Sequence, residues 1–172
     1  RTFSAAAVIA IAAFAAFGGF LFLNTLYLQE VRGLSPLSAG LCTLPLAAMT
    51  VVVSPIAGRV VGTRGVRGPL VVGGLAVSAG SLMLVSLSAD TSLGWLLAAY
   101  SVFGLGFGAV NPPITNAAVS GMPASQAGVA AAVATTSRQI GLTLGVAVFG
   151  AGATAGVAGS LRSAAATAAA RS

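Results

Sequence analysis

Five long apolar runs, separated by short polar turns, constrain this chain more than any other feature of its sequence. Hydrophobic residues make up 57% of the 172 residues and charged residues only 6%, whereas about a quarter of the residues in soluble domains are charged. A run of about 20 apolar residues crosses a bilayer as a helix. The sequence therefore predicts an all-α membrane protein, a polytopic transmembrane helix bundle with spans at about 4–28, 36–57, 69–87, 93–116 and 129–150.

The two ends of the chain differ from these runs. Residues 151–172 are rich in alanine and less apolar than the spans, and we expect a loop, a surface helix or a tail there. The chain begins with Arg1 rather than Met, directly before an apolar run, which favours a piece of a longer polypeptide. A cleaved signal peptide is the competing interpretation, but the first run is longer than a signal core.

Arginines in the short loop 58–70, GRVVGTRGVRGPL, predict the orientation of the bundle (Arg59, Arg64 and Arg67). Clusters of basic residues in short loops stay on the cytoplasmic side of a membrane. This loop and Arg1 then lie inside, while the turns that carry Glu30 and Asp90 lie outside. We expect a multi-pass protein of the inner (plasma) membrane.

Prolines and one serine mark where the helices begin or are disturbed. Ser35 is suited to cap the second span, and Pro36 suits its first helical position, where a missing N–H costs nothing. Pro45 lies inside the same span and predicts a bend. In the fourth span, Pro112 and Pro113 release two carbonyl groups from their usual helical bonds, and such groups need a partner or a wet cavity in a membrane.

The composition excludes several kinds of site. The sequence contains no histidine, a single cysteine and only two acidic residues, so we expect no metal site, no disulfide, no cofactor and no enzyme active site. The net charge of +6 does not indicate nucleic acid, because the arginines are scattered among the spans without an aromatic-interleaved basic face. The glycines at 104, 106 and 108 follow no strand and are not a nucleotide loop.

Arg138 is the most unusual residue, because it lies inside the fifth apolar run. At 1.5 Å per residue it would be about 15 Å deep, where an arginine costs about 2.5 to 3.5 kcal/mol. Thr136, Gln139 and Thr143 form an adjoining polar stripe at helical spacing. We interpret Arg138 and Gln139 as residues that line a polar pathway. Alternatively, the helix starts near Arg138, and its side chain reaches the inner interface.

Three more polar residues are candidates for lining the same pathway: Asn111, Thr115 and Asn24. Hydrogen bonds between helices are the alternative role for Asn111 and Thr115. The G-x-x-x-G spacings that begin at Gly104 and Gly141 predict close contact between helices, since small residues let helix backbones approach.

Three pieces of sequence, at 25–45, 58–70 and 134–150, resemble the C-terminal half of a major facilitator superfamily transporter of the fourteen-helix drug:proton antiporter (multidrug efflux) branch. The loop resembles a degenerate copy of the superfamily signature G-x-x-x-D-R-x-G-R-K, with matches at Gly58, Gly65 and Arg67. Gly62 stands where the signature has aspartate, which argues against a gating charge pair in this loop.

The resemblance covers residues 3–150 and implies that the five spans are helices nine to thirteen of fourteen. It implies export of small hydrophobic or cationic molecules by proton antiport, in which two halves of a bundle expose a central site alternately to each side. The implied partners are a small-molecule substrate, protons, the lipid bilayer and the missing N-terminal half. The alternative is a membrane module for assembly or interaction that does not transport.

Overall fold

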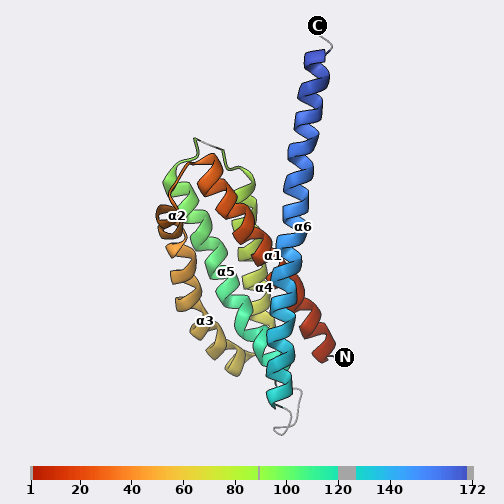
Figure 1. The fold of residues 1–172 in the computed structure, drawn as a ribbon. Helices are drawn as coiled ribbons and strands as arrows, with labels where there is room; N and C mark the ends of the chain where they lie inside the picture. Colours follow the sequence, from red (N-terminus) through yellow and green to blue (C-terminus); the bar gives the residue numbers. More distant parts are fainter. Residues whose placement is uncertain (1, 89, 120–126, 170–172) are drawn as a thin grey trace.

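The computed structural model describes residues 2–88, 90–119 and 127–169 (Figure 1). Regular structure in this part is helical throughout: α1 (Thr2–Leu26), the π-helical turn η1 (Tyr27–Val31), α2 (Pro36–Cys42), α3 (Leu44–Arg64), α4 (Arg67–Val85), α5 (Leu93–Val119) and α6 (Ala127–Ala169).

Five stretches of these helices are long and apolar enough to cross a membrane: Ala7–Val31, Pro36–Arg64, Arg67–Val85, Leu93–Asn116 and Ala131–Gly159. The prediction of an all-α bundle with five spans is therefore confirmed. The main difference lies after residue 150, where residues 151–169 continue α6 instead of leaving the helix. Alanine is the strongest helix former and no proline interrupts this segment, so the helix continues. Residues 170–172 lie outside the described part, and the division into a bundle and a tail stays a prediction.

The predicted start of the second span is confirmed in detail. Ser35 is the N-cap of α2, and its Oγ accepts a hydrogen bond from the backbone N–H of Ser38 at 3.3 Å. Pro36 is the first helical residue.

Pro45 disturbs the second span, as predicted, but as a one-residue interruption at Thr43 rather than as a bend inside a continuous helix. α2 ends at Cys42, α3 begins at Leu44, and Pro45 lies in the first turn of α3. A proline in this turn needs no N–H bond, whereas inside a continuous helix its ring would disturb the carbonyl one turn earlier. The hydroxyl of Thr43, at the junction, donates to the carbonyl of Gly40 at 2.7 Å.

α5 stays helical through Pro112 and Pro113 and reaches Val119. The predicted need for a partner is met at Gly108, the residue one turn before Pro112. Its carbonyl accepts a hydrogen bond from the Ser54 hydroxyl of α3 at 3.2 Å.

Glycines allow close backbone contact at two helix interfaces, α3 with α5 and α1 with α6, which we call the glycine seams. A Cβ on Gly104 of α5 would lie 2.4 Å from the carbonyl oxygen of Leu46 in α3, and one on Gly141 of α6 would lie 2.6 Å from that of Ile11 in α1. Real Cβ atoms do not approach so closely, so these positions need glycine. The packing role predicted for both G-x-x-x-G spacings is confirmed.

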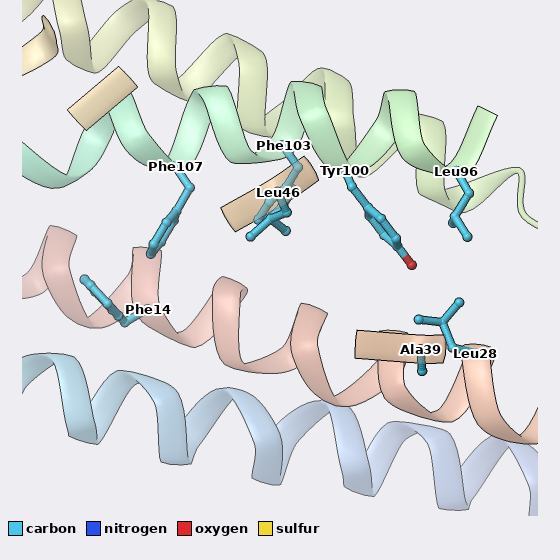
Figure 2. Packing of buried hydrophobic residues seen from close by; sticks show 8 residues of the cluster. All are labelled: Phe14, Leu28, Ala39, Leu46, Leu96, Tyr100, Phe103 and Phe107. Carbon is cyan, nitrogen blue, oxygen red and sulfur yellow. The ribbon is translucent and has the colours of Figure 1, made fainter. Parts of the chain in front are cut away.

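α5 lies in the middle of the bundle, with α3 and α4 packed on it and α1 paired with α6 (Figure 1). Figure 2 shows the buried core, in which side chains of α5 point toward α1. Phe17 stacks on Phe107 with ring centroids 4.1 Å apart, and Phe20 stacks on Phe103 at 4.4 Å. Offset aromatic pairs of this kind contribute about 0.5–1.5 kcal/mol each. They fix α1 against α5.

The turns lie alternately at the two ends of the bundle (Figure 1). The hydroxyl of Tyr27, after α1, donates to the carbonyl of Ser88, after α4, at 2.7 Å. Near the same end, the indole N–H of Trp95 donates to the carbonyl of Met83 at 3.2 Å. Tyr27 and Trp95 therefore lie at the same end of the bundle. The α3–α4 turn lies at the other end, and the side of the membrane that each end faces stays a prediction.

Candidate functional site

The structure brings three of the predicted residues together on α5 and α6. Asn111 and Thr115 lie one turn apart on α5, and residues at this spacing share a face. From α6, the Nη2 group of Arg138 donates to Asn111 Oδ1 at 3.1 Å and to Thr115 Oγ1. Thr115 in turn donates its hydroxyl proton to the Asn111 carbonyl at 3.1 Å. We call these three residues the arginine cluster.

An aromatic ring from α1 completes the surroundings of Arg138. The guanidinium carbon lies 5.2 Å from the centre of the Phe14 ring, within range of a cation–π interaction. Phe14 is buried and contacts Phe107 edge to face, with centroids 5.4 Å apart. The sequence analysis did not identify Phe14, because a phenylalanine in an apolar span gives no signal of a cationic neighbour.

The positive charge of Arg138 has no acidic neighbour. Its Nε atom is buried without a hydrogen-bond partner. The two acidic residues of the chain, Glu30 and Asp90, are exposed and lie near the opposite end of the bundle. From Leu93 to Asn111 the helix α5 rises about 27 Å at 1.5 Å per residue. Among the residues that the structure describes, nothing therefore compensates this cation.

The helix start near Arg138 that the alternative assumed is wrong, whereas reach of the Arg138 side chain to the inner interface stays a prediction. α6 begins at Ala127, about three helical turns earlier. The Arg138 side chain is partly buried and bonds across to α5.

A hollow of about 450 Å³ adjoins the arginine cluster. It is lined by Ser54, Asn111, Pro112, Thr115 and Asn116. The volume falls within the range of about 300–1,000 Å³ for small-molecule sites, but the hollow is wide open rather than enclosed. A guanidinium can only donate hydrogen bonds, which holds Asn111 Oδ1 toward Arg138 and leaves the amide N–H groups for other partners.

Gln139 does not join the arginine cluster. The side of α6 that packs on α1 is formed by Ser137, Gly141 and Gly145, which are buried. Gln139 is exposed and points about 200° around the helix from Ser137, because successive residues differ by about 100°. The stripe that Gln139 forms with Thr136 and Thr143 therefore faces away from α1.

Asn24 lies in a separate place. It is 8% exposed, and its Oδ1 accepts a hydrogen bond from the Tyr100 hydroxyl of α5. A second hollow of about 480 Å³ includes Asn24 and is otherwise lined mostly by apolar and aromatic residues of α1 and α4. The structure thus pairs Asn24 with a neighbouring helix at a distance from Arg138.

The residues of the signature-like loop form a tight turn. Gly65 ends α3 with φ at +86°, a backbone conformation that residues other than glycine rarely adopt. Arg67 begins α4 and is exposed. Gly58 lies inside α3, where a Cβ would come within 3.9 Å of the Pro112 side chain.

Five helices long and apolar enough to cross a membrane are the feature of a polytopic membrane protein, and a cation with amide groups lies beside an open hollow on this bundle. The sequence profile of the Major Facilitator Superfamily matches residues 2–146, and the chain belongs to this family. It is therefore a piece of a transporter and not of an enzyme.

Similar proteins are named for drug resistance. The chain is 41% identical to the tetracenomycin C resistance and export protein of Streptomyces glaucescens, over 80% of the chain and 26% of that protein. It is 39% identical to the multidrug resistance protein Stp of Mycobacterium tuberculosis (77% and 24%) and 36% identical to the methyl viologen resistance protein SmvA of Salmonella typhimurium (83% and 29%).

The chain thus spans about a quarter of the length of these relatives. They confirm the resemblance to the fourteen-helix multidrug efflux branch and the prediction that the chain is a fragment. No solved structure matches the chain.

Proposed function

We propose that the full-length protein exports small hydrophobic or cationic molecules by proton antiport, and that this chain forms most of the C-terminal half of its helix bundle. Family membership and relatives named for multidrug, tetracenomycin C and methyl viologen resistance support this proposal. The protein would lie in the inner (plasma) membrane and work with its N-terminal half, by alternating access.

The observation that carries the proposal is the arginine cluster beside its hollow. A cation inside a membrane span costs free energy and is kept where it faces a bundle interior, a water-filled cavity or a partner. Arg138 bonds to Asn111 and Thr115, both of which line the hollow. We assign these three residues to the substrate pathway.

Gln139 contributes from another side of the same helix. With Thr136 and Thr143 it forms a polar stripe on the exposed side of α6, opposite the seam with α1. A polar stripe in a span is costly against lipid, so we assign it to the surface that other helices of the full-length protein cover. Asn24 is the weakest candidate, because the Tyr100 hydroxyl already occupies its oxygen.

Transport by the full-length protein tests the proposal. Cells that lack their own efflux pumps and express the protein should accumulate less ethidium than cells with an empty vector. A protonophore should remove the difference, because proton antiport needs the proton gradient. If the protein reaches the membrane but ethidium and several unrelated compounds accumulate as in the vector control, the non-transporting alternative is favoured.

A further inference from the structure

We infer that Arg138, Asn111 and Thr115 form a binding site for a carboxylate that comes from outside this chain. The inference rests on the proposed function, since it names the chemistry that the hollow in the transporter recognises. It is carried by the charge of Arg138, by its unused donors and by the groups around it.

The charge comes first. The guanidinium is permanently cationic. The acidic side chains of this sequence, Glu30 and Asp90, lie near the other end of the bundle. Of all side-chain anions, a carboxylate matches the planar guanidinium best, because two oxygens can accept from two N–H groups at once. A carboxylate at this position would compensate the buried charge.

The hydrogen-bond donors of Arg138 are only partly used. A guanidinium has five N–H donors, and those of Nη2 are directed at Asn111 and Thr115, while the buried Nε has no partner. The guanidinium carbon lies over the Phe14 ring, 5.2 Å from its centre. Because Nε is buried inside the chain, a carboxylate from outside would accept from the N–H groups of Nη1, in the plane of the guanidinium.

The neighbouring hollow also favours an acceptor. With Asn111 Oδ1 turned to Arg138, its amide N–H groups remain available beside Thr115 and Asn116. Ser54 already donates its proton to Gly108. A bare cation would meet the Arg138 charge without an acid to offset it, whereas a carboxylate would meet a cation and amide donors.

A carboxylate can come from two sources. One is an aspartate or glutamate in another span of the full-length protein, which would also place an acid beside the hollow for a cationic substrate. The other is a carboxylate on a free ligand. Both bind Arg138 by the same chemistry, and they are distinguished below.

Asn111→Asp tests the site in the purified full-length protein. The substitution keeps the shape of the side chain but places a carboxylate against Nη2 of Arg138. We expect it to raise Tm by a few degrees, and we expect this gain to disappear in the Asn111→Asp/Arg138→Gln double variant. A Tm change that is negative, or equal in both backgrounds, would overturn the inference.

Benzoate and its neutral analogue benzamide separate the two sources. If benzoate raises Tm of the wild type, but not of Arg138→Gln or Asn111→Asp, and benzamide has no effect, the site takes a free carboxylate. If benzoate has no effect, the carboxylate should be an aspartate or glutamate in one of the remaining spans. Replacing that acid by its amide should then reduce transport as much as Arg138→Gln does. Combining the two substitutions should cause no further loss of transport. If benzoate has no effect and no acid of the remaining spans behaves in this way, the inference of a carboxylate site is contradicted.

Arg162→Gln is the matched control, because it removes the same charge from the exposed part of α6. It should keep the wild-type responses to Asn111→Asp and to benzoate. The Tm measurements do not depend on transport. Failure of the proposed function, seen as absent ethidium export by the wild type, is therefore distinguishable from failure of the carboxylate site.

Discussion

Two contacts between polar side chains of different helices occur in the described part of the chain, and they differ in charge and in how completely they are satisfied. Asn24 and Tyr100 form a neutral pair, 8% and 0% exposed, in which the tyrosine hydroxyl donates to the amide oxygen. Arg138 is charged, has a buried Nε without a partner, and bonds to two residues that line a hollow. The first contact connects helices and is closed. The second contact leaves N–H donors of Arg138 without a hydrogen-bond partner.

The comparison teaches that a polar residue in a span is not by itself a sign of transport. In a membrane, a hydrogen bond between helices contributes about 0.6 kcal/mol on average, and neutral pairs commonly serve packing. Unused donors on a cation beside a hollow favour a partner that lies outside the described residues. The following predictions test whether the two contacts differ in this way.

The largest effect is expected from Arg138→Gln in the full-length protein. Hydrogen bonds to charged groups contribute about 1.5–3 kcal/mol, which corresponds to about a ten- to hundredfold loss of transport rate. Ethidium efflux from preloaded cells measures it, with membrane content checked by immunoblot. Efflux within twofold of wild type for several substrates would remove Arg138 from the pathway.

Solvent access should separate the two contacts next. In a Cys42→Ala background, a cysteine at Thr115 should react with a water-soluble maleimide, because Thr115 is exposed beside the hollow. A cysteine at Asn24, which is buried, should react far more slowly. Mass spectrometry of the labelled protein gives both rates. Equal rates would mean that the two sites are equally open.

The two contacts should also lie nearer to opposite sides of the membrane. Thr63 lies in the last turn of α3, at one end of the bundle, and Ser92 precedes α5 at the other. Cysteines at these positions should be labelled from opposite sides, Thr63 from the cytoplasm. Whole cells and inverted vesicles provide the test, and labelling of both from one side would contradict the topology.

The smallest effect is expected from Tyr100→Phe, which removes the hydroxyl that bonds to Asn24. Bonds of this kind contribute about 0.6 kcal/mol and at most about 1.7 kcal/mol. The variant should lower Tm slightly and keep ethidium efflux. Thermal unfolding in detergent and the efflux assay together check this. A loss of efflux as large as that of Arg138→Gln would erase the contrast between the two contacts.

Much of the fold was predictable, because apolar runs report membrane spans directly. The cap at Ser35 and Pro36 was also predictable, since it depends on neighbouring residues alone. The break before Pro45 was not, because a proline permits either a bent helix or a new helix start, and packing decides between them. The end of α6 was missed because alanine suits both a loosely apolar tail and a continued helix.

The site was predictable residue by residue but not as an arrangement. Arg138 stood out because a cation in a span is rare and costly. Its contact with Asn111 depends on how α6 is rotated against α1 and α5, and the close approach at Gly141 fixes that rotation. Gln139, one residue later, consequently faces elsewhere, since each residue turns the helix by about 100°.

The glycine seams have a mechanical consequence. At Gly104 against Leu46, and at Gly141 against Ile11, the nearest atoms across the seam are backbone carbonyl oxygens. Side chains from the opposite helix also fill the same seams: the Phe149 ring of α6 lies where a Cβ of Gly19 in α1 would be, and Phe14 lies beside Gly141. Sliding one helix along the other, as in shear motions of packed helices, would require these rings to leave their places. The α3–α5 and α1–α6 seams therefore act as locks that hold each pair of helices as one unit, and the arginine cluster lies at the contact between the two pairs.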